Sequence, residues 1–389
     1  MVSVVNRHNK TIIIIKKHRP MTSLSHNNAQ RPLQTALGNA VNGYFQQNNI
    51  AKTGNKALYQ KAIIITLMFI GSYACFYIFP EPYSWLAWAF HGFATALVGF
   101  NIMHDGAHGS FSNNKRLNSL AAHTFNIIGS NAFYWKQKHN LNHHPYTNVA
   151  AADEDIEAFG LLRMSPDKPR YWFHRWQHIY IWLLYPLTSL FWFFVLDFLA
   201  YFNQKIGEQE FSQKYGVKES GIFWLSKAFY LLTYLIIPGY FLGWETTLIG
   251  FLCLHAIMGV LFAVVFQLAH VVDKTEFPKP DENGNLPYEW AAHQLATTAD
   301  FAPKSKFTTW CVGGLNFQVE HHLFPRISHI HYPELHKIVR EVCATENVVH
   351  REYPSVWQAI IGHVRHLKNM GQIDARVNDG CLEASSRLS

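Results

Sequence analysis

The sequence predicts an all-α integral membrane protein, with four transmembrane helices in two hairpins, interfacial helices, and a histidine-rich cap on the cytoplasmic side. Three observations predict this fold class. Apolar residues are concentrated in long blocks, and only 15% of the 389 residues are charged. Basic residues flank these blocks. Histidines cluster at three distant points of the chain, beside the apolar blocks.

The distribution of charge indicates which side of the membrane the flanks occupy. The formal net charge is +7. Lys52, Lys56 and Lys61 precede the first apolar block, and Lys115 and Arg116 follow the second. Such basic flanks are typical of the cytoplasmic ends of membrane helices. We therefore expect no nucleic-acid partner. The five cysteines lack CxxC spacing, which argues against a disulfide framework or a zinc ribbon.

Composition divides the chain into three parts. Residues 1–55 are polar and rich in Asn and Gln, and we expect them to form a flexible N-terminal segment in which Met21 is an alternative start to Met1. Residues 56–350 are expected to form the membrane domain. Residues 351–389 are expected to be a C-terminal tail.

The first hairpin is predicted from two apolar runs, at about 62–80 and 84–103. Each run has the roughly 20 residues that a helix needs to cross the hydrocarbon core. The Pro80-Glu81-Pro82 turn between them carries no Lys or Arg, as expected on the far side of the membrane. Trp85 and Trp88 near this turn suit the aromatic belt at a membrane interface.

Three later segments are apolar, at 179–202, 223–242 and 246–269. If all three crossed, the third histidine cluster would lie on the opposite side of the membrane from the first two. The segment 179–202 carries Asp197 and several Trp and Tyr residues, a composition typical of an interfacial helix. We therefore expect 223–242 and 246–269 to form the second hairpin, with both termini cytoplasmic.

The histidine clusters are spaced as ligands on helices would be. Two residues one turn apart follow the second span, and the second cluster has the spacing i, i+4, i+5, which keeps the rings on or near one face. An eighth candidate lies where the last span leaves the membrane, a place where polar residues are often functional. The candidate ligands are His104, His108, His139, His143, His144, His270, His321 and His322.

So many imidazoles indicate a dimetal site, because one metal ion rarely needs seven of them. A structural zinc site would be closed, four-coordinate and usually rich in Cys. Histidines without thiolates favour a redox-active metal with open positions. Non-haem iron with O2 is therefore the leading chemistry, and the membrane supplies a lipid acyl chain as the substrate.

Ligating imidazoles usually donate their second ring N–H to a carboxylate or a carbonyl. Six carboxylates lie near the clusters in the sequence, and we expect two or three of them to act in this way: Asp105, Asp153, Asp155, Asp273, Asp300 and Glu320. The favoured supporting residues, of which His293 is also a possible ligand, are Asn101, Asp105, Asp155, His293, Gln318 and Glu320.

At residues of roughly 60 to 350 the chain resembles the membrane fatty acid desaturases, which carry three histidine boxes around two irons. The segments NIMHDGAHGSF, KHNLNHHPYTN and GGLNFQVEHHLFPRISHIHYPEL are similar to those boxes and their surroundings. The resemblance implies four spans and two non-haem irons on the cytoplasmic side. It also implies O2 as the oxidant and a buried tunnel for an acyl chain that is linked to a lipid or a thioester. On this pattern the seven box histidines are ligands, and His270 is the extra one.

The third box opens with Gln318 rather than His, which resembles the front-end branch of that family. This branch implies a new cis double bond, Δ6 or Δ5, in an already unsaturated chain such as linoleoyl. FQVEHHLFP is especially similar to bacterial linoleoyl-type desaturases. The HPGG motif of a fused cytochrome b5 domain does not occur. We therefore expect a separate ferredoxin, or a cytochrome b5 with its reductase, as electron donor, and a bacterial inner membrane as the location.

Two other functions are compatible with parts of this pattern. One is a membrane di-iron hydroxylase or ketolase acting on a lipid, an alkane or a carotenoid, because the same metal chemistry serves both reactions. The other is a non-redox protein, either a zinc hydrolase or a lipid-binding receptor. The QVEHH form of the third box favours desaturation.

Overall fold

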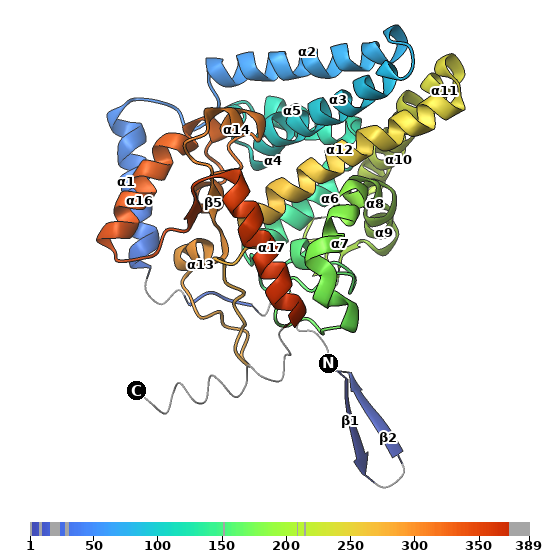
Figure 1. Ribbon diagram of the computed structural model, residues 1–389. Coiled ribbons are helices and arrows are strands. Elements are labelled where there is room, and N and C mark those ends of the chain that lie inside the picture. Colours follow the sequence, from blue (N-terminus) through green and yellow to red (C-terminus); the bar gives the residue numbers. More distant parts are fainter. Residues whose placement is uncertain are drawn as a thin grey trace, which may run out of the picture.

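The computed structural model describes residues 2–7, 10–15, 24–27, 31–150, 152–207, 209–213 and 215–372. Within these residues the fold is mostly helical, as predicted (Figure 1). Met21 lies outside the described residues. The strands are short and form pairs: β1 (Val2–Arg7) with β2 (Lys10–Ile15) and β3 (Lys205–Ile206) with β4 (Gln209–Glu210), both antiparallel, and β5 (Asp300–Phe301) with β6 (Glu352–Tyr353), parallel.

Among the described residues, five helices are long and apolar enough to cross a membrane, where four spans were expected. Outward side chains such as Ile63, Leu67 and Leu225 are exposed, as lipid-facing positions would be. The five are α2 (Lys56–Ile78); α3 (Tyr83–Val98) continued by the π-helix η2 (Gly99–Met103) and α4 (His104–His108); the segment Trp172–Asn203; α10 (Val217–Leu231) continued by η8 (Leu232–Ile236) and α11 (Ile237–Leu242); and α12 (Trp244–His270).

The helices α3, which leads to His104, and α12, which ends at His270, pack directly against each other at the centre of the fold. Two glycines allow this close approach. A Cβ on Gly92 would lie 2.4 Å from the carbonyl oxygen of Leu254, and one on Gly250 would lie 2.6 Å from the Trp88 ring. Small residues let helix backbones approach closely in this way. Phe76 of α2 stacks on the Trp88 ring, and the two ring centroids lie 3.8 Å apart.

The segment Trp172–Asn203 is broken rather than continuous. Pro186 contributes to one break because it has no backbone N–H to donate. Near this break the segment packs on the middle of α12, where a Cβ on Gly259 would lie 2.7 Å from the Tyr185 carbonyl oxygen. The pieces are η5 (Trp172–Trp176), α7 (Gln177–Leu184), η6 (Tyr185–Leu187), α8 (Thr188–Phe191), η7 (Trp192–Leu196) and α9 (Asp197–Asn203).

A buried ion pair anchors the far end of this segment. Lys227 Nζ lies 2.8 Å from a carboxylate oxygen of Asp197. The ammonium group also donates to the carbonyl oxygens of Gly129 and Phe193, each at 2.7 Å. The Lys227 charge is therefore fully hydrogen-bonded, which offsets the large cost of burying it.

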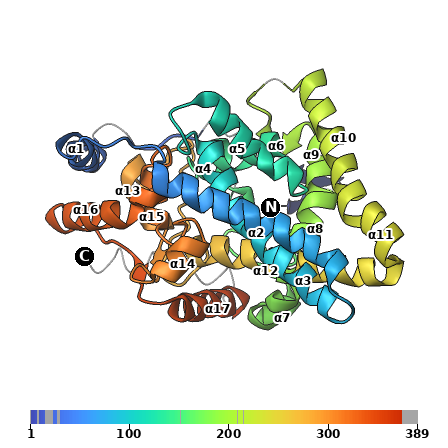
Figure 2. The ribbon, with the colours of Figure 1, turned by 90° about the horizontal axis from the view of Figure 1, so that it is seen from above.

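The remaining helices form a cap at one end of the long helices, and Figures 1 and 2 both show α10 and α11 extending away from α1, α13 and α16. The cap and its connections comprise α1 (Pro32–Gln47), α5 (Lys115–Ile127), α6 (Ala132–Lys136), η3 (Gln137–His143), η4 (Glu154–Ile156), α13 (Trp290–Thr297), α14 (Lys306–Cys311), α15 (Gln318–Leu323), η9 (His329–His331), α16 (Tyr332–Thr345) and α17 (Val356–Gln372).

Both ends of the described chain contribute folded helices to this cap, whereas the composition suggested a flexible segment and a tail. Leu37 and Val41 bury one face of α1, which packs against α16 and α13. On α17, Leu367 packs with Ile181 of the segment Trp172–Asn203, and Ala359 packs with Leu268 of α12. The apolar residues on these faces are few and spaced three or four apart, so average composition does not reveal them.

Candidate metal centre

The first histidine cluster lies where α3 changes its helical form. The π-helix η2 follows α3 and leads directly into α4, which carries both histidines. π-helical turns are rare and are frequent at functional sites. The rings of His104 and His108 lie with centroids 4.7 Å apart, so both project to one side of α4. Gly109 ends the helix with a φ of 75°, a conformation that glycine adopts without a steric penalty.

The second cluster lies in another π-helix, η3. The backbone N–H of His144 donates to the carbonyl oxygen of His139 at 3.0 Å, which is the i to i+5 bond of a π-helical turn. This turn brings residues five apart onto the same side. The Nε2 atoms of His139 and His144 consequently lie 3.1 Å apart. An α-helix of the same sequence would point these two rings in different directions.

The third cluster and His270 complete the centre from the other side. The short helix α15 carries His321 and His322. His270 is the last residue of α12. The ring centroid of His322 lies 4.8 Å from that of His270 and 4.4 Å from that of His144. The ring of His321 lies 4.5 Å from that of His104.

The eight histidines meet as two neighbouring groups. In the first, one ring nitrogen from each member lies within 4.8 Å of the others: His104, His108, His139 and His321. The second group meets the same criterion: His143, His270 and His322. His144 lies between the groups, because it also forms a close set with His321 and His322. Residues from both hairpins and from the cap therefore form one paired centre.

The donor atoms of this centre are buried and lack partners. Within the described part of the chain, no hydrogen-bond partner reaches Nε2 of six of these rings: His104, His108, His143, His270, His321 and His322. A buried polar atom without a partner costs roughly 1–3 kcal/mol, and native proteins contain few of them. Six such atoms facing one another fit a pair of metal ions with imidazole ligands.

The other ring nitrogen of several histidines is held by a neighbour. Nδ1 of His143 donates to the Asp153 carboxylate at 3.0 Å, and Nδ1 of His322 lies 3.0 Å from the Gln294 side-chain oxygen. A proton held on Nδ1 leaves the Nε2 lone pair free for a metal. Nδ1 of His321 lies 3.1 Å from the Tyr332 hydroxyl group. Gln294 and Tyr332 are supporting residues that the sequence did not suggest, because no metal-binding pattern contains them.

Two of the favoured supporting residues lie beside the centre. A carboxylate oxygen of Asp155 lies 3.3 Å from His143 Nδ1, and Asp155 also pairs with Lys138 at 2.6 Å. The Gln318 side chain interacts with the ring of His270. Gln318 thus lies next to the second group, at the position where the third box departs from His.

The other four favoured residues form different contacts. Asn101 donates to the carbonyl oxygens of Leu97 and Cys311. Asp105 accepts a hydrogen bond from Ser328 at 2.7 Å and lies 3.0 Å from His329. His293 hydrogen-bonds with the Thr147 carbonyl oxygen at 3.0 Å, and the Thr147 hydroxyl group in turn hydrogen-bonds with the ring of His322. Glu320 faces a separate cluster of His336 and His350.

Burial keeps most of these imidazoles neutral, which is the form that binds metal. Burial, and then the neighbouring histidines, hold the pKa of four rings well below the usual value: His139, His144, His321 and His322. His143 behaves differently. Burial lowers its pKa, but the Asp153 and Asp155 carboxylates outweigh that effect and raise it above the usual value.

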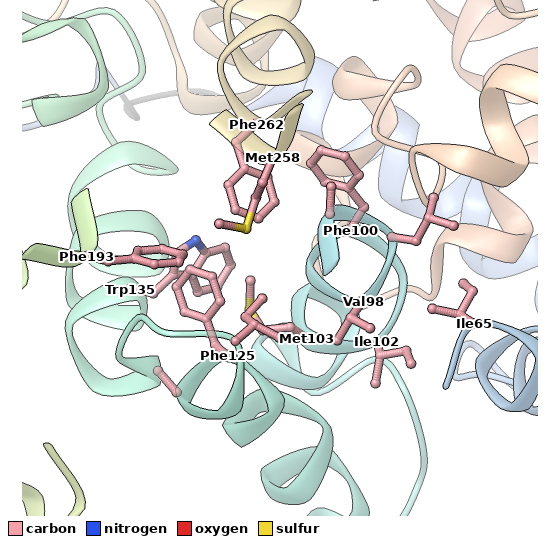
Figure 3. Packing of buried hydrophobic residues seen from close by; sticks show 14 of the residues in the cluster. Ile65, Val98, Phe100, Ile102, Met103, Phe125, Trp135, Phe193, Met258 and Phe262 are labelled. Atoms are coloured by element: carbon pink, nitrogen blue, oxygen red, sulfur yellow. The ribbon is translucent and has the colours of Figure 1, made fainter. Parts of the chain in front are cut away.

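A small apolar pocket borders the first group of histidines. Its volume is about 10 Å³, and the His104 side chain forms part of its wall. Figure 3 shows side chains from α3, α5, α6, α12 and η2 converging around this region. Its other walls are formed by Gly99, Phe100, Met103, Phe125, Trp135, Trp192, Phe262, Phe266 and Leu315. The lining is apolar, which suits contact with a hydrocarbon chain rather than with a polar substrate.

The helical fold and this site define a class: helical proteins in which histidine clusters that could hold metal ions lie beside an apolar pocket. The comparisons with known proteins identify the family. The family model described as fatty acid desaturase matches residues 83–354. The chain belongs to the fatty acid desaturase family and is an oxidoreductase that acts on acyl chains. Its long apolar helices and its family associate it with a membrane.

Similar proteins are desaturases by name. The sn-1 linoleoyl-lipid 6-desaturase of Synechocystis sp. is 35% identical over 356 residues, which cover 88% of this chain and 96% of the relative. The protein of the same name from Arthrospira platensis is 36% identical, with 86% and 91% covered. The acyl-lipid (8-3)-desaturase of Physcomitrium patens is 36% identical, with 87% and 71% covered. These matches support desaturation over the hydroxylase and ketolase alternative.

Proposed function

We propose that this protein is a front-end acyl-lipid desaturase, which inserts a cis Δ6 or Δ5 double bond into an unsaturated chain such as linoleoyl. One observation carries the proposal: a small apolar pocket is lined by His104, beside ring nitrogens that have no other partner. Both 6-desaturases named above are linoleoyl-lipid enzymes by name. Gln318 at the opening of the third box favours the front-end branch.

The metal in this proposal is iron, with two ions held by the eight histidines. The donor set fits, since imidazole nitrogens without thiolates suit a redox-active metal. Such a pair of irons supplies the O2-dependent removal of two hydrogens from adjacent methylene groups. Asp153 and Gln294 hold the rings of His143 and His322 in a fixed orientation. Asp155, Gln318 and the more distant supporting residues complete the surroundings of the centre.

The cavity wall positions the substrate. Phe125, Trp135 and Phe262 present apolar surfaces that exclude water and suit contact with methylene groups. The depth to which the chain enters then decides which carbons lie against His104, and this sets the position of the double bond.

We propose four membrane spans, with the segment Trp172–Asn203 lying at the interface. The close approach of His143 and His270, whose ring centroids are 4.7 Å apart, supports this arrangement. Three complete crossings between these two residues would separate them by the thickness of the bilayer. The buried pair of Asp197 with Lys227 lies beside Gly129, close to the segment that enters the second box. Both ends of the segment therefore contact cap elements.

By this topology the centre and both termini face the cytoplasm, and the inner membrane of a bacterium is the proposed location. Electrons come from a separate donor, either a ferredoxin or a cytochrome b5 with its reductase. The relatives from Synechocystis sp. and Arthrospira platensis are similar in length to this chain and match most of it. This similarity supports a donor on a separate chain.

Expression in a host that is supplied with linoleate, together with a ferredoxin system, tests the proposal. Gas chromatography of the total fatty acids should reveal a new Δ6 or Δ5 product that depends on the intact protein. A hydroxy fatty acid in its place would contradict desaturation. The matched control is the His322→Ala variant at the same expression level, which should form no product.

A further inference from the structure

A second cluster of potential metal ligands lies behind the third histidine box, outside the paired centre. It combines Asp300 from β5, Glu320 from α15, His336 from α16 and His350 from the loop before β6. One donor atom from each residue lies within 4.8 Å of the other three. None of the eight histidines of the paired centre belongs to this group. The strands β5 and β6 pair with each other, and α15 packs against α16.

The burial of this cluster is unusual for such polar side chains. Asp300 and Glu320 are both 0% exposed. Two carboxylates in so little contact with water require compensating positive charge, because an isolated buried charge is costly. No Lys or Arg in the described part of the chain pairs directly with either carboxylate. The compensation must therefore come from the two histidines or from a bound cation.

One of the four distances is that of a hydrogen bond, and the other three are longer and fit donor atoms around a cation. Nδ1 of His336 lies 2.9 Å from Asp300 Oδ2 and 3.3 Å from Glu320 Oε1. Nε2 of His350 lies 3.4 Å from each of the same two oxygens. Charge-assisted N–H···O bonds are typically about 2.7–2.9 Å. A tetrahedral zinc ion with bonds of about 2.0–2.2 Å keeps neighbouring donors roughly 3.3–3.6 Å apart.

The same pattern follows from the directions available to each donor. A ring N–H can point well at one acceptor, yet each of these nitrogens approaches both carboxylates at once. Among the described residues, moreover, no hydrogen-bond partner reaches Oε2 of the fully buried Glu320. Both observations are explained if the four donor atoms surround one bound cation.

Neighbouring groups hold the donors in place as they do around known metal ions. The backbone N–H of Val319 donates to Asp300 Oδ1 at 2.9 Å, on the side away from the cluster. Nε2 of His336 lies 3.4 Å from a Glu352 carboxylate oxygen, and this carboxylate lies 3.8 Å from Arg340. A carboxylate behind a ligating imidazole orients the ring and increases its basicity.

We propose that Asp300, Glu320, His336 and His350 bind one structural Zn²⁺ ion. Two carboxylates and two neutral imidazoles neutralise the ion, and four protein ligands close the site to substrate. The ion joins α15, which carries His321 and His322, to β5, α16 and the loop before β6. Its role is to fix the third histidine box against the cap, and it does not depend on the reaction at the paired centre.

The test uses the full-length protein, purified in detergent after growth with added Fe²⁺ and Zn²⁺. Mass spectrometry of the metals should find one Zn²⁺ per chain in addition to the metal of the paired centre. Zinc X-ray absorption should report four N or O neighbours at about 2.0–2.2 Å. The His336→Ala/His350→Ala variant should lose this zinc and retain iron, whereas His322→Ala should retain the zinc and lose iron.

The His363→Ala/His366→Ala variant is the matched control, because it removes two buried histidines of α17 and should keep all the metal. If the His336→Ala/His350→Ala variant does not fold, Asp300→Asn replaces it and should weaken zinc retention against a chelator at least tenfold. No metal beyond the paired centre in the wild-type protein would overturn the proposal. A third metal that persists in the variants of this cluster would also overturn it.

Discussion

Nδ1 of His143 lies 3.0 Å from both carboxylate oxygens of the buried Asp153, ten residues further along the chain. The same carboxylate accepts from the backbone N–H groups of Asn148 and Asp155, so its position does not depend on the histidine. This pair shows how the centre is organised: the loop after the second box is folded back to orient a ring that the box itself carries.

Asp153→Asn should weaken metal binding by about 10-fold, within the range seen when such orienting groups are replaced. The amide keeps the shape of the carboxylate but loses the charge that favours a proton on His143 Nδ1. The measurement is the iron retained per chain against increasing chelator. Asp155→Asn is the control and should have a smaller effect, because its carboxylate is 25% exposed and pairs with Lys138. Equal effects of the two changes would contradict this account.

His321→Ala should abolish desaturation while the protein remains in the membrane. His321 is fully buried between His104 and His144. Its removal therefore takes one ligand from the first group and disturbs His144, which lies between the two groups. Product formation and membrane content are measured together. Retained turnover would remove the third box from the centre.

Gly99→Val should reduce turnover of long acyl chains about tenfold or more without changing the metal content. A Cβ at this position would already lie 3.0 Å from the Phe262 ring, and a larger side chain would fill the cavity beside His104. Overpacking of a filled region also costs about 1–3 kcal/mol of stability. Gly38→Val on α1, where a Cβ meets no neighbour, is the control. Unchanged product formation in Gly99→Val would show that the acyl chain does not use this cavity.

Lys227→Met should destabilise the protein by about 3–5 kcal/mol, because it leaves the buried Asp197 without its cation. The double variant Lys227→Met/Asp197→Leu should recover much of this loss, since no uncompensated charge remains. Thermal unfolding in detergent gives both values. A double variant as unstable as Lys227→Met would mean that the ion pair itself, rather than the unpaired charge, decides the stability.

The docking of α17 should weaken as the pH falls below neutrality. Burial, opposed by hydrogen bonding to the Val271 carbonyl oxygen, lowers the pKa of His363 to about 4, from 6.5. The unfolded helix therefore takes up a proton near pH 6.5, whereas the docked helix stays neutral until about pH 4. Stability is fully present above pH 6.5 and is lost between these values, at roughly 1.4 kcal/mol per pH unit.

Hydrogen exchange of the α17 amides at pH 7.5 and 5.5, corrected for intrinsic rates, measures this effect. His366 also has a lowered pKa, because it is buried. The control is therefore His363→Gln/His366→Gln, in which α17 cannot be protonated at these positions. Its protection should not depend on pH. Equal protection of wild-type α17 at the two pH values would contradict the prediction.

The sequence by itself determined the class of fold and the identity of the histidines. Spacing, apolar length and basic flanks are properties of neighbouring residues, so they can be recognised in any linear segment. For this reason the helical fold, the candidate histidine ligands and the family could be predicted, and the family was confirmed. Four spans were predicted, whereas five helices of the described residues are long and apolar enough to cross, because the segment Trp172–Asn203 meets the same criteria of length and composition.

The tertiary structure decided which partners meet. Asp153, Gln294 and Tyr332 orient three of the candidate ligands from separate segments. Asp153 was one of six carboxylates that the sequence suggested, whereas nothing local to Gln294 or Tyr332 indicates this role. The π-helical turn that brings His139 and His144 together could not be predicted either, because the spacing i, i+5 was interpreted as part of an α-helix. Glu320 is adjacent to His321 in the sequence yet faces a different cluster. Neighbouring helical residues point in different directions, and only packing decides what each of them meets.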